Sequence, residues 1–249
     1  MADEGLEAAR RRWLAGGALE DGVAYLSRRL RAGEVDDDLL RVAAHCGHPA
    51  ARQVLAARGR RSDLPVAPPA ARPGAVARVR FALAGVPVGE PVAWQGLDPA
   101  QRGRLHDLRT WVERLALAGS QGKAACVRAA VAAARRALDG AGAPTDGPGW
   151  AGVDRAVEWL RCPCPAHESG ALDLLLWDDE ARPPRWADRA GAAAWAVRSA
   201  RALGDVAAAA AMAAEAAAMA VGPVAVEEAM RDHLLGWALA ERDPLLDGP

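Results

Sequence analysis

The stretch DPAQRGRLHDLRTWVERLALAGSQGKAACVRAAVAAARRAL, residues 98–138, contains the start, the turn and the end of a predicted helical hairpin. Aspartate before proline is typical of a helix start, because Asp98 can cap the first turn and Pro99 already has the φ of a first helical residue. The pattern predicts one helix to about residue 118 and a second over about 121–138. Two helices joined by so short a connection pack antiparallel, so this stretch favours an all-α fold.

The residues on the N-terminal side of this hairpin predict a small helical unit over residues 1–58. Apolar residues recur there at helical spacing, and glycines stand where the helices are expected to end. The acidic run from Asp36 to Asp38 lies at a helix start, where the helix dipole favours negative charge. The four expected helices are residues 3–15, residues 18–32, DDLLRVAAH, and a short helix that starts at His48-Pro49.

A proline-rich linker is expected over residues 59–74, followed by a main alanine-rich domain over 75–249. The start of that domain allows at most a short β-hairpin near 75–92, because its prolines keep any strand short or at an edge. The expected architecture is antiparallel helical hairpins in a bundle or an irregular solenoid. Beyond residue 138, helices are expected near 150–161, 165–178, 185–203, 205–220 and 223–241.

The composition favours a globular protein that does not use nucleic acid as a partner. Of the 249 residues, 51% are hydrophobic, and a chain of this length buries a sizeable core without disulfides. Lys+Arg 31 against Asp+Glu 32 gives a net charge of −1, whereas binding to nucleic acid needs a clustered excess of cations. Lys123 is the only lysine, and this preference for arginine is typical of a GC-rich genome.

The chain is expected in the cytoplasm, without a membrane partner. Its start, MADEGLEAARRRW, lacks the apolar core of a signal peptide. The most apolar stretch, Val206 to Val226, is mostly alanine and contains Glu215, so it does not predict a membrane span. Four cysteines without a secretory signal indicate reduced thiols.

The stretch WLRCPCPAHESG, residues 159–170, has the residue types of a metal site. Cys162, Cys164 and His167 offer two thiolates and an imidazole, and structural zinc usually takes four ligands of these kinds. The fourth ligand is expected from His45, Cys46 or His48 in the segment HCGH, with His48 as the first candidate. One alternative function is therefore that of a structural zinc-binding helical protein.

A second interpretation of the same stretch needs no metal. Pro163 and Pro165 cannot continue the preceding helix, so the segment is expected to form a stiff corner between two helices. The two cysteines would then be small buried side chains, and His167 would lie in the first turn of the next helix. A disulfide between the cysteines is disfavoured, because a single intervening proline strains the ring.

The sequence contains no complete catalytic constellation. GSQGKAA, residues 119–125, lacks both the preceding strand and the hydroxyl after lysine that a phosphate-binding loop needs. No serine lies in a G-x-S-x-G elbow. We therefore expect a non-enzymatic protein without catalytic residues or a cofactor. An enzyme whose site is dispersed between helices remains the second alternative.

One acidic residue interrupts the alanine-rich helix expected over 205–220. Glu215 falls between Met212 and Met219 on the same helical face. An acid in that position lies either at the rim of the core or buried beside an arginine. We expect Glu215 at the rim.

The aromatic residues are nearly all tryptophan, with nine tryptophans against one tyrosine and one phenylalanine. Alanine-rich helices approach closely, so the pattern favours tryptophans that fill the remaining gaps in the core. The competing interpretation is an interaction surface, since tryptophan is enriched in binding hot spots. Trp177, Trp186 and Trp195 recur at every ninth position and are the candidate partner-binding residues.

The order of segments in the last three fifths of the chain resembles a known family. LRTWVERLALAGSQGKAACVRAAVAAARRAL is followed by GPGWAGVDRAVEWLRCP, by alanine-rich helices and by HLLGWALAERDPLL. This order resembles the immunity-protein family of bacterial polymorphic-toxin systems, and related alanine-rich helical proteins of myxobacteria and similar high-GC bacteria. The resemblance implies a small cytosolic protein that binds another protein, either immunity-like or a scaffold. Self-association through an alanine-rich face would make it a homo-oligomer.

Overall fold

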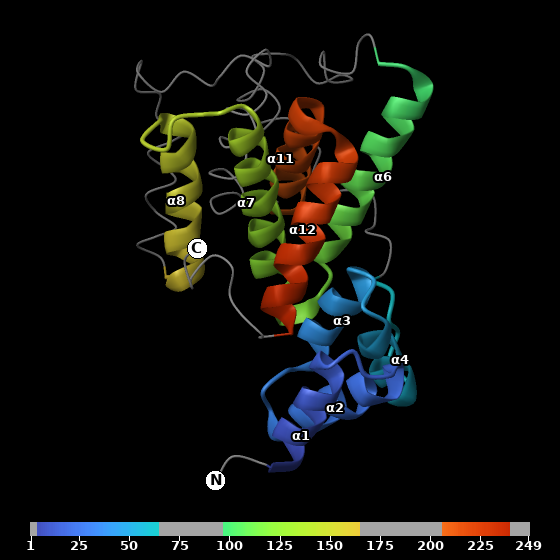
Figure 1. The fold of residues 1–249 in the computed structure, drawn as a ribbon. Coiled ribbons are helices and arrows are strands. Elements are labelled where there is room, and N and C mark those ends of the chain that lie inside the picture. The colour runs from blue at the N-terminus through green and yellow to red at the C-terminus, as the bar shows by residue number, and fades with distance from the viewer. Residues whose placement is uncertain (1–3, 65–96, 165–205, 240–249) are drawn as a thin grey trace. The chain divides into compact units, whose positions relative to one another are not determined.

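The computed structural model describes residues 4–64, 97–164 and 206–239 (Figure 1). Every regular element in these ranges is a helix, which confirms the predicted all-α fold. The β-hairpin expected near 75–92 lies outside the described residues, as do the helices expected near 165–178 and 185–203. The described helices form two compact units, and each is considered by itself.

The first unit contains four short helices, as the sequence predicts. Its described residues are 4–64 together with 118–121 and 234–239. Helix α2 contacts both α1 and α4, and α3 packs against α4. The four helices are α1 (Glu4–Leu14), α2 (Leu19–Ala32), α3 (Asp37–His45) and α4 (Pro49–Ala57).

The glycine after α2 is needed for the way that helix ends. Gly33 has φ of 75°, in the left-handed region, and its N–H donates to the carbonyls of Arg29 and Leu30. The buried guanidinium of Arg29 pairs with Glu34 at 3.1 Å and also donates to the carbonyl of Leu239. A charged side chain is tolerated inside this unit because its donors have acceptors.

The second unit is a bundle of longer helices. Its described residues are 97–117, 122–164 and 206–233. The helix start predicted at Asp98-Pro99 is confirmed as a reciprocal cap. Asp98 Oδ1 accepts from the Gln101 backbone N–H at 2.8 Å, and Gln101 Oε1 accepts from the Asp98 N–H at 3.1 Å. The helices are α6 (Pro99–Leu115), α7 (Gly122–Gly140), α8 (Pro148–Arg161), α11 (Val206–Val221) and α12 (Pro223–Ala238).

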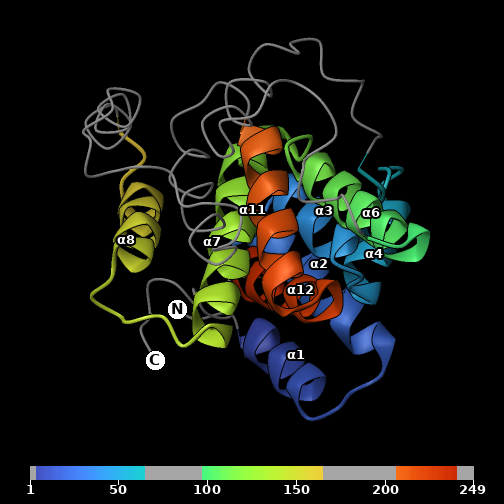
Figure 2. The same cartoon turned by 90° about the horizontal axis from the view of Figure 1, so that it is seen from above.

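Helix α11 lies against both α7 and α6, as two perpendicular views show (Figures 1 and 2). All its residues from Ala208 to Ala218 are buried, so the helix is covered on every side over three turns rather than on one face. Alanine allows neighbouring helices to approach closely, because little side chain separates the backbones. Helix α7 also contains a run of buried small residues, Ala129 to Ala134.

Two further helices complete the second unit. Helix α8 packs against α7, and α12 buries Val226, Met230 and Leu234, which recur at every fourth position. The last turn of α12, from Leu234, is counted with the first unit. None of the helices in the described ranges combines the length and the apolarity that crossing a membrane requires.

Candidate functional site

Helix α6 places polar side chains on both flanks of its buried stripe. Each helical residue advances by about 100° around the axis. Arg109 and Trp111 therefore fall on opposite sides of the stripe. One flank faces α11 and the other meets α12. The stripe consists of Leu105, Leu108, Val112 and Leu115.

On the first flank, α6 supplies the cation for a buried carboxylate. Arg109 Nη1 lies 3.5 Å from Glu215 Oε1, and Arg109 Nε donates to Glu113 Oε1 at 2.8 Å. The side chain of Glu215 is only 3% exposed. Our expectation that Glu215 lies at the rim is therefore wrong. Glu215 is covered because α11 is enclosed on every side from Ala208 to Ala218, which the pattern of one helix cannot reveal.

On the second flank, an arginine covers the ring of Trp111. The guanidinium of Arg231, on α12, lies 5.1 Å from the ring centroid, within cation–π range. Arg231 is held in turn by Glu227, which accepts from its Nη2 at 2.6 Å and from its Nε at 2.9 Å. The three side chains thus form a fixed aromatic–cation–anion series across two helices.

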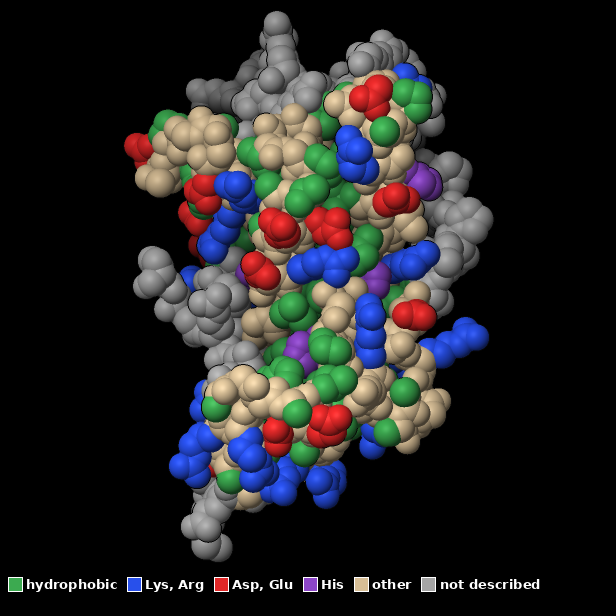
Figure 3. Space-filling view, turned by 45° about the vertical axis from the view of Figure 1, so that its right-hand side comes forward, with side chains coloured by type: hydrophobic (Ala, Val, Ile, Leu, Met, Phe, Trp, Pro, Cys, Tyr) green, Lys and Arg blue, Asp and Glu red, His purple; other side chains and the backbone are tan. Residues whose placement is uncertain are grey.

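Val224 extends this series along α12. Positions 224, 227 and 231 share one face of a helix, because they are three and four residues apart. Val224 is 62% exposed and is the only large hydrophobic side chain so exposed in the described part of the chain. We call Trp111, Val224, Glu227 and Arg231 the Trp111 face. Figure 3 shows the side of the molecule with α6 and α12, where acidic, basic and hydrophobic side chains alternate.

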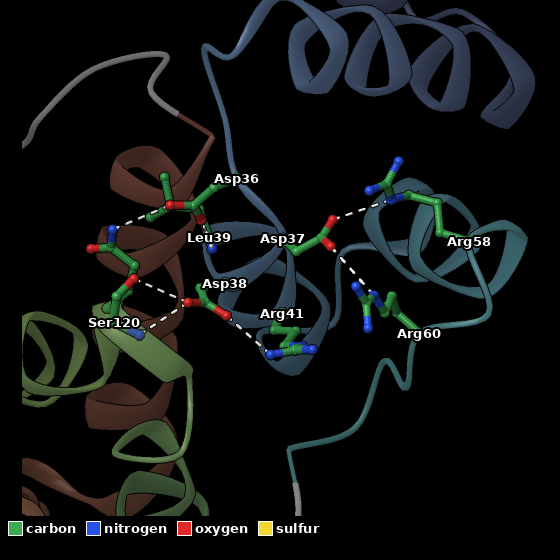
Figure 4. A network of polar contacts seen from close by, with 9 residues as sticks. Asp36, Asp37, Asp38, Leu39, Arg41, Arg58, Arg60 and Ser120 are labelled. Carbon is green, nitrogen blue, oxygen red and sulfur yellow. Dashed lines mark hydrogen bonds and ion pairs between the residues drawn. The ribbon is translucent and has the colours of Figure 1, made fainter.

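A second polar network lies in the first unit, around the acidic start of α3 (Figure 4). Asp38 Oδ2 accepts from both the backbone N–H and the hydroxyl of Ser120, each at 3.0 Å, and Asp38 Oδ1 pairs with Arg41 at 3.0 Å. Asp37 pairs with Arg58 at 3.3 Å and with Arg60 at 3.5 Å. These carboxylates are already paired, so they hold the turn at 119–121 and the end of α4 in place.

Asp36 has the capping role that its position predicts. Its Oδ1 accepts from the Leu39 backbone N–H at 2.7 Å, and its Oδ2 accepts from Gln121 Nε2 at 3.4 Å. The first contact follows from local sequence. The second joins residues 85 positions apart, which no local pattern contains.

The structure describes two of the predicted metal ligands next to each other. Cys162 follows the last residue of α8 and is exposed, and Cys164 is partly buried, so the expectation that both are buried is wrong. The pKa of the Cys162 thiol is raised by its hydrogen bond to the Cys164 thiol. His167 lies outside the described residues.

The third described ligand candidate, His48, belongs to the first unit. Its Nδ1 accepts from the Ala51 backbone N–H at 3.2 Å and so caps α4, while its ring meets Trp13 edge-on with centroids 5.8 Å apart. Within residues 4–64, 97–164 and 206–239, no three histidine, cysteine or acidic side chains gather where they could hold a metal ion. With His167 undescribed, the four-ligand zinc site stays a prediction.

The three tryptophans proposed for partner binding, Trp177, Trp186 and Trp195, lie outside the described residues. Their role therefore stays a prediction. Trp159 does fill the core, since it is 4% exposed and lies under the ammonium of Lys123, 4.8 Å from its ring centroid. The Trp111 face was missed by sequence reasoning, because it requires a contact between α6 and α12.

Comparison with known proteins gives no relative from which a function could be transferred. No protein-family model matches the chain, and neither a curated protein nor a solved structure matches it.

Proposed function

We propose that the chain is a non-enzymatic helical module that binds another protein through the Trp111 face, in an immunity-like or scaffold role. The observation that supports this proposal is the arrangement of Trp111, Arg231 and Glu227 on the outer side of α6 and α12. The ring is partly exposed, and the charged groups beside it are already oriented.

Tryptophan and arginine are the residues that most often dominate the free energy of a protein interface. Immobilising a free arginine on binding costs about 0.5–1.5 kcal/mol of side-chain entropy. Arg231 is already held by Glu227 and by the indole ring, so part of that cost has been met before a partner arrives. The neighbouring Val224 adds apolar area that water covers in the free protein.

The charges of the face also favour a protein partner of mixed character. Glu227 and Arg231 carry opposite charges within about one helical turn. Such a pair favours a partner with a complementary pair of charges and disfavours a surface whose charges all have one sign. The resemblance of residues 108–246 to the immunity-protein family independently implies a partner protein. A second copy of this chain is the competing occupant.

A photocrosslinker placed at the exposed end of the face tests the proposal. p-Benzoylphenylalanine would replace Val224 in the full chain, which is then irradiated in lysate of its source organism. We expect one discrete adduct that disappears when Arg231→Glu is added. The same crosslinker at Gln53, exposed on α4, is the matched control and should not yield that adduct.

Three outcomes would contradict the proposal. An adduct that persists with Arg231→Glu would show that the Trp111 face does not select the partner. Substrate turnover by the purified chain in a broad activity screen would show that the module is an enzyme. An adduct with the mass of two chains would show that the face binds a second copy of this chain and not a different protein.

A further inference from the structure

The turn after α8 holds two thiols against each other. The backbone N–H of Cys164 donates to the carbonyl of Cys162 at 2.8 Å, which closes a three-residue turn around Pro163. An inverse γ-turn needs φ near −75° at its central residue, and the proline ring fixes φ close to that value. The residue between the cysteines therefore stabilises the turn that holds Cys162 and Cys164 close together.

The two sulfurs are close and accessible. The Cys162 and Cys164 thiols form a hydrogen bond with each other. Cys162 is exposed, and Cys164 is partly buried, so a solute reaches the pair without unfolding of α8. The chain's other two cysteines, Cys46 and Cys126, are buried.

The position of the pair favours a cation. Cys162 is the capping residue just after the end of α8, and the C-terminal end of a helix carries a partial negative charge. Two thiolates facing each other add negative charge at the same point. Thiolate ligands select soft, thiophilic ions, of which Cu(I) is the monovalent example.

We propose that Cys162 and Cys164 form a chelating dithiolate site that takes one soft, thiophilic cation of the Cu(I) class. Binding forms two sulfur–metal bonds and releases the thiol protons, without any change of oxidation state at sulfur or metal. The site requires only residues 162–164 and stands apart from the Trp111 face, so it does not depend on the proposed protein partner.

An anaerobic titration of the reduced full-length chain with Cu(I), in competition with a chromophoric Cu(I) chelator, tests this site. We expect one equivalent to bind and Cys162→Ser or Cys164→Ser to weaken binding at least tenfold. The double variant Cys46→Ser/Cys126→Ser, which keeps the exposed pair, is the matched control and should bind as the parent does. Circular dichroism of each variant verifies that its helices remain.

Three results would overturn the proposal. One is Cu(I) binding that the serine variants at 162 and 164 leave unchanged. The second is the absence of stoichiometric binding by a chain whose thiols are shown to be reduced. The third is Zn(II) binding, lost in Cys162→Ser, that the addition of Cu(I) fails to displace. That result would indicate a closed site with further ligands, as four-coordinate zinc requires.

Discussion

Arg109 on α6 and Glu215 on α11 form an ion pair in which the two partners depend on each other unequally. Nη1 and Oε1 are 3.5 Å apart, but Arg109 also bonds Glu113 and is 19% exposed, whereas Glu215 is 3% exposed. Losing an opposite charge costs a buried group more than it costs a group that water reaches. The two single substitutions should therefore differ in their effect on the free energy of unfolding.

Removing the arginine should therefore destabilise the protein more than removing the acid. We expect Arg109→Met to lower the free energy of unfolding by about 3 kcal/mol, because it leaves the Glu215 carboxylate without this cation. Glu215→Met should cost about 1 kcal/mol, because Arg109 keeps Glu113. Urea unfolding followed by circular dichroism measures both values.

Glu113→Met is the control for this comparison, since it removes the more exposed of the two carboxylates that pair with Arg109. It should cost about 0.5 kcal/mol, as partly exposed helical pairs do. Equal losses for Arg109→Met and Glu215→Met would show that the ion pair does not carry the stability assigned to it.

Two glycines should respond in opposite directions to the same substitution. Gly119 has φ of 59°, and a Cβ there would collide with the carboxylate of Asp38, so Gly119→Ala should lower the free energy of unfolding by about 2 kcal/mol. Gly103 is an exposed residue of α6 with open space around it, so Gly103→Ala should raise it by about 0.5–1 kcal/mol. Thermal and urea unfolding of the two variants test the pair, and a gain at Gly119 would refute the collision.

The cap of α4 should make stability depend on pH near neutrality. Burial lowers the pKa of His48, and only the neutral ring can accept the Ala51 N–H. The contribution is therefore fully present above the unfolded-state pKa of about 6.5 and is lost as the pH falls from there through the folded-state pKa. His48→Asn keeps a capping acceptor that does not titrate.

Unfolding free energies at about pH 8 and about pH 5, on either side of the ordinary histidine pKa, measure this effect. The parent should lose more stability between the two values than His48→Asn does. Identical losses would mean that another group accounts for the dependence.

The only lysine should stabilise the packing of α8 through its charge. Lys123 Nζ lies 4.8 Å from the centroid of the nearly buried Trp159 ring. We expect Lys123→Met to lower the free energy of unfolding by about 1 kcal/mol, while Lys123→Arg, which keeps a cation over the ring, should stay close to the parent. A loss of the same size in both variants would assign the effect to shape instead of charge.

Local sequence patterns predicted most of the described helices, but not which helices pack against each other. The cap at Asp98, the proline that starts α12 and the extent of α3 are each fixed within a few residues of sequence. The helix from Asp98 ends at Leu115, about one turn before the expected residue 118, and a short 3-10 turn, Gly119–Gln121, leads into α7. Helix limits are therefore less certain than helix positions.

The burial of Glu215 and the Trp111 face depend on neighbours distant in sequence. Alanine is compatible with a core or a surface, so a run of alanines does not show how many helices will cover it. The contact between Asp38 and Ser120 joins residues 82 positions apart, and the contact of Trp111 with Arg231 spans still more. Such pairs follow from tertiary packing, which one unaligned sequence does not contain.

The enclosure of α11 by close neighbours also limits how this sequence can evolve. A residue from Ala208 to Ala218 cannot become larger without displacing the atoms packed around it, unless a facing side chain becomes smaller. Substitutions on α11 should therefore occur together with compensating ones on α6 or α7. In an alignment of related chains, that joint variation would trace the contacts of α11 position by position, while the exposed residues of α4 would vary independently.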